Sequence, residues 1–89
     1  MSADPSRLPV PETLTVYGAA WCGDCRMVTR YLDQHGVPYR YLDLGSDPNA
    51  QAALDAAGIR SIPVITTIDG RILIEPSFQQ LSAAGIGPA

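Results

Sequence analysis

The chain has 89 residues, of which 46% are hydrophobic, so it can bury the core of one domain and no more. Its formal net charge of −3 excludes a basic surface of the kind that binds nucleic acid. No apolar run is long enough to span a bilayer, so no membrane segment is expected.

Residues 1–12 are predicted to be a flexible lead-in to a single domain formed by residues 13–89. Pro5, Pro9 and Pro11 interrupt this segment and disfavour regular structure. It also lacks the apolar stretch of a secretory signal, so we expect a cytoplasmic protein. Cysteines in a reducing compartment are more often redox-active or metal-binding than structural.

A strand and a helix are predicted next. Residues 13–17 alternate β-branched and apolar side chains, which is typical of a strand. Three small residues, 18–20, connect this strand to a helix beginning at Gly23. Gly36 follows at the position of a left-handed C-terminal cap. The apolar residues of the helix recur at helical spacing, at Cys25, Val28 and Leu32.

A second strand and helix are predicted in the middle of the chain. Residues 39–44 have strand-like composition. Asp47 is placed to cap a helix, and Pro48 suits the first helical position. The helix is expected to end at Gly58.

The last third is predicted to contain a hairpin and a short helix. Strands at 64–68 and 71–75 flank Asp69-Gly70, a dipeptide that favours a two-residue type I′ turn. Ser77 and Gln80 have the spacing of a capping box, which predicts that a helix starts there.

The predicted order, β-α-β-α-β-β-α, indicates an α/β fold with a four-stranded mixed sheet and helices on both faces. Strands separated by helices pair in parallel, whereas the hairpin imposes an antiparallel pair. The expected core consists of apolar residues from these elements: Leu14, Val16, Val28, Leu32, Tyr41, Leu54, Val64, Ile65, Ile72, Ile74, Phe78 and Leu81.

The sequence Trp21-Cys22-Gly23-Asp24-Cys25 lies between the first strand and its helix. A helix N-terminus carries unpaired N–H groups and partial positive charge, which favour a thiolate at Cys22. Cys25 lies almost one turn further on and is expected to be less exposed. Cys22 is therefore the predicted nucleophile and Cys25 the resolving thiol. We expect no metal, since the chain supplies only one histidine and no further cysteine for a four-ligand zinc site.

The motif W-C-G-x-C after a first strand, together with Ile62-Pro63 before a later strand, resembles the thioredoxin superfamily. The resemblance covers residues 13–86. The length and the start on the catalytic strand are similar to glutaredoxins, and most of all to bacterial glutaredoxin-like redoxins, including mycoredoxins and those that reduce ribonucleotide reductase. It implies the thioredoxin fold, with a cis peptide bond before Pro63 facing the active-site disulfide; a trans, strand-starting proline is the alternative.

The resemblance implies a small thiol-disulfide oxidoreductase that reduces protein or low-molecular-weight mixed disulfides. It would act as a monomer through a redox-active Cys22–Cys25 disulfide, without a prosthetic group. Ile62 and Pro63 would bind substrate, and Trp21 is expected to form an apolar lip beside the nucleophile. The donor stays open among glutathione, mycothiol and a flavoprotein reductase, because alanines at 19 and 20 stand where glutaredoxins tend to place a basic residue.

Two alternatives remain open. A carboxylate at Asp24, about 7 Å from the Cys22 sulfur, would raise the free energy of the thiolate by about 0.6–2.4 kcal/mol for effective dielectric constants of about 80 to 20. Arg26 and Arg60 could offset this effect, or Asp24 could simply face solvent.

The second alternative concerns function: a thioredoxin-fold binding module whose cysteines carry an iron–sulfur cluster or a metal. Such a protein would be coloured.

Overall fold

The structure, a computed structural model, describes residue 4 and residues 8–87. Its elements follow the predicted order. A four-stranded sheet has the strand order β2-β1-β3-β4. The first strand, β1 (Thr15–Gly18), pairs in parallel with β2 (Arg40–Asp43) and antiparallel with β3 (Val64–Thr66). β3 in turn pairs antiparallel with β4 (Ile72–Ile74), so the predicted mixed sheet is present.

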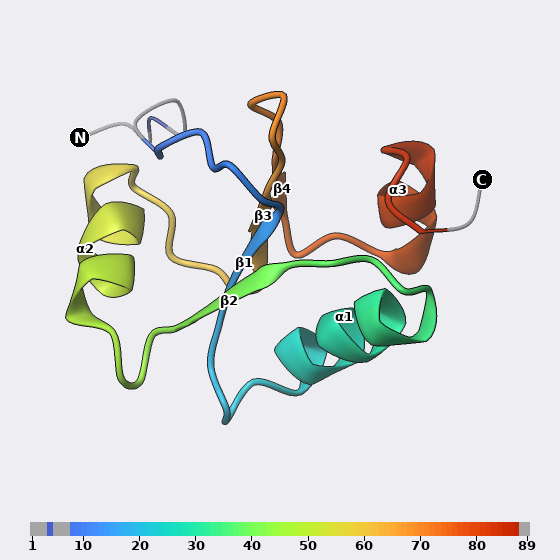
Figure 1. Cartoon of the computed structure of the whole chain (residues 1–89). Coiled ribbons are helices and arrows are strands. Elements are labelled where there is room, and N and C mark those ends of the chain that lie inside the picture. Colours follow the sequence, from blue (N-terminus) through green and yellow to red (C-terminus); the bar gives the residue numbers. More distant parts are fainter. Residues whose placement is uncertain (1–3, 5–7, 88–89) are drawn as a thin grey trace.

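The helices cover both faces of this sheet (Figure 1). One face carries α1 (Gly23–Gln34) and α3 (Phe78–Ala83), and the other carries α2 (Pro48–Ala56). Side chains alternate between the faces, as they must along a strand. Val16 therefore packs with α1 and α3, while its neighbour Tyr17 packs with α2. None of the helices in the described residues is long and apolar enough to cross a membrane.

Local sequence signals explain where α2 and α3 begin. The Asp47 carboxylate accepts hydrogen bonds from the N–H groups of Asn49 and Ala50, at 3.0 and 3.4 Å. Ser77 Oγ accepts from the Gln80 N–H at 3.1 Å, and the Gln80 side chain accepts from the Ser77 N–H at 2.8 Å. These bonds satisfy N–H groups that have no partner inside the helix. The predicted cap of α2 and the capping box of α3 are confirmed.

The hairpin between β3 and β4 differs from the prediction. The Gly70 N–H donates to the Thr67 carbonyl, and the Thr67 N–H donates to the Arg71 carbonyl, at 3.0 Å each. The loop therefore contains three residues, 68–70. A type I′ turn needs positive φ at both central residues, whereas Asp69 has negative φ and only Gly70 is left-handed, with φ 86°. The predicted two-residue type I′ turn is wrong.

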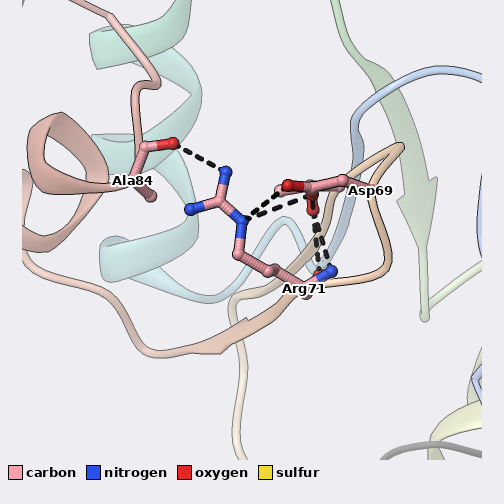
Figure 2. A network of polar contacts seen from close by, with 4 residues as sticks. Asp69, Arg71 and Ala84 are labelled. Carbon is pink, nitrogen blue, oxygen red and sulfur yellow. Dashed lines mark hydrogen bonds and ion pairs between the residues drawn. The ribbon is translucent and has the colours of Figure 1, made fainter.

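Side-chain bonds explain this loop. The Thr67 hydroxyl donates to the Asp69 carboxylate and accepts from the Arg71 N–H. The Arg71 guanidinium pairs with Asp69 at 3.0 Å and donates to the Ala84 carbonyl at 2.8 Å (Figure 2). Ala84 is the C-cap of α3, so the same arginine links the hairpin to that helix.

Three expected core residues are exposed instead: Tyr41, Ile74 and Phe78, at 39%, 44% and 45%. Tyr41 and Ile74 lie on the two edge strands, where a neighbouring strand covers only one side. Phe78 is the first residue of α3 and stacks on Tyr31 with ring centroids 5.1 Å apart, so its other face meets solvent. The remaining core candidates are buried or partly buried.

Part of the expected lead-in contacts the core. Leu8 is 4% exposed and packs with the apolar residues between α2 and the sheet. The Asp4 N–H donates to the Ala57 carbonyl, just beyond the end of α2. The domain boundary after residue 12 stays a prediction, and the rest of the lead-in, residues 1–3 and 5–7, lies outside the described residues.

Candidate active site

The two cysteines lie where the chain passes from β1 into α1, and both are free thiols. Cys22 is the N-cap residue of α1, and its Sγ accepts a hydrogen bond from the Cys25 N–H at 3.2 Å. Its side chain is half-buried. A sulfur in this position receives both a backbone N–H and the positive end of the helix, which are arrangements that favour a thiolate.

Cys25 lies in a different environment although it is only three residues away. Its side chain has no exposed surface. Burial and a hydrogen bond with Cys22 raise the pKa of the Cys25 thiol from 9.0 to about 12, against a smaller lowering effect of a hydrogen bond from the Ala19 backbone. Cys25 is therefore a neutral, buried thiol at physiological pH. Cys22, in contrast, is partly exposed and can be reached by another molecule.

The segment before β3 closes the site. The peptide bond between Ile62 and Pro63 is cis, as the resemblance implies. The Cys22 thiol donates a long hydrogen bond to the Ile62 carbonyl, with sulfur and oxygen 3.9 Å apart. Pro63 is buried, and its carbonyl accepts from the Glu75 N–H at 2.8 Å. The Ile62 carbonyl thus lies at the Cys22 sulfur despite a separation of 40 positions along the chain.

Trp21 and Asp24 border the site on different sides. Trp21 is 71% exposed, and its ring packs closely over Gly45. It lines an open hollow that also contains Ile62 and Arg60. Asp24 is exposed and lines a second hollow with Pro63 and Glu75. Arg60 and Asp24 therefore border different hollows, and an offset of the Asp24 charge by Arg26 or Arg60 stays a prediction.

One residue near the cysteines was expected only as a core residue of a strand. Tyr41 of β2 lies opposite Val16 of β1. A Cβ atom at Gly18 would be 2.8 Å from the Tyr41 hydroxyl and 3.1 Å from the Cys25 sulfur. Both groups therefore converge on the space left by this glycine. The register of β1 and β2 brings the two groups together, and no local sequence pattern indicates that Tyr41 lies near Cys25.

In the part of the chain that the structure describes, no three His, Cys, Asp or Glu side chains form a group that could hold a metal ion. The site contains two thiols of unequal exposure at a helix N-terminus, where the Cys25 backbone N–H donates to the Cys22 sulfur.

Known proteins share both the sequence pattern and the fold. Residues 14–73 match the family model described as glutaredoxin. A Mycobacterium tuberculosis protein assigned as a glutaredoxin is 26% identical over 76 residues, covering 83% of this chain and 90% of the relative. The glutaredoxin-like protein NrdH of Lactococcus lactis is 30% identical over 56 residues, covering 63% of this chain and 78% of the relative. Among solved structures, the glutaredoxin-like NrdH-redoxin of Escherichia coli, described by its thioredoxin-like activity profile, is 25% identical with a TM-score of 0.69. The match covers 85% of this chain and 96% of that one.

Proposed function

The chain belongs to the glutaredoxin family of thiol-disulfide oxidoreductases and has their thioredoxin fold, and on this premise we propose that it reduces disulfides in protein partners by a two-thiol mechanism. Cys22 is the nucleophile and Cys25 the resolving thiol. The observation that carries the proposal is the inequality of the two sulfurs. Cys22 is accessible and accepts the Cys25 N–H, while Cys25 is fully buried with a raised pKa.

The reaction has two exchange steps. The Cys22 thiolate attacks one sulfur of the substrate disulfide, forms a bond to it, and releases the other sulfur as a thiolate that takes up a proton. Cys25 then loses its proton and attacks Cys22. The bond between Cys22 and the substrate breaks, the second substrate sulfur leaves with the electron pair and is protonated, and a Cys22–Cys25 disulfide remains. The substrate gains two electrons and two protons.

Ile62, Pro63 and Trp21 are proposed to hold the substrate. Among the described residues the Ile62 N–H has no hydrogen-bond partner, so it is available to pair with an extended substrate backbone beside Cys22. The exposed indole of Trp21 offers apolar surface next to the same sulfur. Both features favour a polypeptide substrate over a small thiol.

For the electron donor we propose a flavoprotein reductase of the thioredoxin-reductase type. The residues before the motif, Ala19 and Ala20, carry no positive charge to hold the carboxylates of glutathione. The hollow beside Pro63 is instead lined by two carboxylates, Asp24 and Glu75. The thioredoxin-like activity profile described for the Escherichia coli relative supports the same choice.

Serine variants of the two cysteines test the roles. We expect Cys22→Ser to abolish reduction of a protein disulfide and Cys25→Ser to accumulate a mixed disulfide with the substrate, visible by mass spectrometry. Ala20→Ser, which introduces a hydroxyl on an exposed residue just before the motif, should leave the activity unchanged. Full activity of Cys22→Ser, or faster alkylation of Cys25 than of Cys22, would reverse the assignment.

The donor is tested on the oxidised wild-type protein. Reduction by glutathione, by mycothiol and by thioredoxin reductase with NADPH is measured side by side, using the appearance of two free thiols per chain as the readout. We expect the flavoprotein to reduce the protein fastest. Faster reduction by either small thiol would contradict the proposed donor and leave the two-thiol mechanism in place.

A further inference from the structure

Resolution of the mixed disulfide requires stabilisation of a Cys25 thiolate, which the two cysteines do not provide by themselves. Cys25 must become a thiolate to attack Cys22, yet it is fully buried. A buried thiolate is costly unless hydrogen-bond donors surround it. Cys22 cannot serve, because in the mixed disulfide its sulfur carries no hydrogen. The Ala19 backbone is one donor at Cys25.

The Tyr41 hydroxyl on β2 is a second candidate donor. The Tyr41 hydroxyl and the Cys25 sulfur approach the same point beside Gly18, within 2.8 and 3.1 Å of where a Cβ would be. Among the described residues this hydroxyl has no hydrogen-bond partner, so its proton is free to be donated. The tyrosine is 39% exposed, so part of this residue meets solvent.

We propose that the Tyr41 hydroxyl donates a hydrogen bond to the Cys25 thiolate as it attacks the mixed disulfide, and so accelerates the resolving step. The inference rests on the two-thiol function proposed above. In that step Cys25 binds to Cys22, the bond from Cys22 to the substrate sulfur breaks, and the proton from Cys25 ends on the departing thiolate through solvent.

The electrostatics agree with a donor role for this phenol. Burial, then negative charge at Cys25, Asp43 and Cys22, raises the pKa of Tyr41 above its ordinary value. The phenol thus keeps its proton over the range in which the enzyme acts. The other ionisable groups that act on Cys25 are Cys22 and Asp24, and both disfavour its thiolate.

Tyr41→Phe removes only the hydroxyl, and Tyr39→Phe is the matched control. Tyr39 lies one residue before β2, and its hydroxyl donates to Asp33 at 2.9 Å. The reduced proteins are mixed with one equivalent of dithiobis(nitrobenzoate) in a stopped-flow instrument. Attack by Cys22 releases the first coloured thiolate in a concentration-dependent phase, and resolution by Cys25 releases the second in a concentration-independent phase.

We expect Tyr41→Phe to slow the second phase by about tenfold, the effect of losing one hydrogen bond to a charged group, and to leave the first phase unchanged. The second-phase pH profile of the variant should move by about one unit to higher pH, since a tenfold change in rate corresponds to one unit of thiol ionisation. Tyr39→Phe should change neither phase. Unfolding midpoints measured in parallel show that both variants are folded.

The outcomes separate this inference from the proposed function. An unchanged second phase in Tyr41→Phe, or equal slowing of both phases, would overturn the role of the hydroxyl. Cys22→Ser, run in the same assay, should lose both phases. If it keeps them, the proposed function itself fails, whatever the tyrosine variant does.

Discussion

The candidate active site contains two cysteine side chains that are chemically alike but lie in different environments, because they are three positions apart at the start of a helix. Cys22 precedes the first helical residue and faces the protein surface, whereas Cys25 points into the layer between α1 and the sheet. The same N–H group links them, because the Cys25 backbone donates to the Cys22 sulfur. Helix geometry therefore explains the unequal exposure of the two thiols, on which their proposed roles rest.

The raised pKa of Cys25 predicts how the stability of the reduced protein depends on pH. Folding raises this pKa from the ordinary value of 9.0 to about 12, so the folded state holds the proton more tightly than the unfolded chain. The resulting stabilisation is present in full below pH 9.0 and is lost as the pH rises towards 12. We expect the urea midpoint of the reduced wild type to fall more steeply over this window than that of Cys25→Ser.

The comparison with Cys25→Ser is needed because tyrosines also titrate at high pH. Burial raises the pKa of Tyr17, of Tyr39 and of Tyr41, so all three contribute to the same loss of stability. Tyr17 and Tyr39 contribute equally in both proteins, and the difference between the two curves reports the cysteine together with the effect of its charge on Tyr41. Parallel curves for wild type and variant would show that the Cys25 thiol is not perturbed by folding.

Asp24 provides a second prediction. The structure leaves its carboxylate exposed, so water screens its charge and the low end of the Coulomb range applies. We expect Asp24→Asn to speed alkylation of Cys22 at neutral pH by about threefold, the equivalent of about 0.6 kcal/mol. The measurement uses iodoacetamide at low salt, with Asp33→Asn as a control further along α1. A tenfold or larger increase would mean that the carboxylate faces the sulfur directly.

Some of these residues could be predicted from sequence and some could not. The roles proposed for Cys22 and Cys25 follow from a five-residue motif next to a helix start, which is local information. Tyr41 has no such signal: its alternating strand pattern suits a core residue, and only the parallel register with β1 brings its hydroxyl to Gly18. Proximity that arises from strand pairing is invisible in a single sequence.

At the scale of the elements, helix starts were the most predictable features because capping is a property of adjacent residues. The α2 cap allows a quantitative test. Asp47→Ala removes an acceptor from two N–H groups and should destabilise the protein by about 1 kcal/mol. Asp55→Ala in the same helix removes only an exposed bond from Gln51, at 2.9 Å, and should cost less than about 0.5 kcal/mol. Equal losses in urea unfolding would contradict the capping role of Asp47.

The hairpin shows where local rules fail. Asp-Gly favours a type I′ turn on average, but the flanking Thr67 and Arg71 supply three further interactions with the loop and with each other. These interactions stabilise Asp69 at negative φ, and the loop has three residues instead of the predicted two. The pairing of β3 with β4 was nevertheless predictable, because either turn type produces an antiparallel hairpin.

At the scale of the whole molecule, the sheet separates two apolar layers, one under α1 and α3 and one under α2. The active site lies at the end of the sheet where β1 ends and β3 begins. The cysteines and Ile62 therefore lie at the ends of the central strands, and the edge strand β2 adds Tyr41 beside Cys25. The cytoplasmic location and the monomeric state stay predictions.

Leu8 tests where the domain begins. Sequence composition favoured a boundary after residue 12, because prolines obscure any periodic signal there, yet Leu8 is buried in the layer under α2 with Leu54 and Val64. Truncating a buried leucine removes its contacts and leaves a cavity, so Leu8→Ala should lower the free energy of unfolding by about 2–4 kcal/mol. Val10→Ala, at a side chain that is 65% exposed, should change it by less than about 0.5 kcal/mol. Urea unfolding of the three proteins measures both effects. If Leu8→Ala is as stable as Val10→Ala, the segment before residue 13 is dispensable and the boundary lies where the sequence placed it; a large, selective loss extends the folded domain to Leu8.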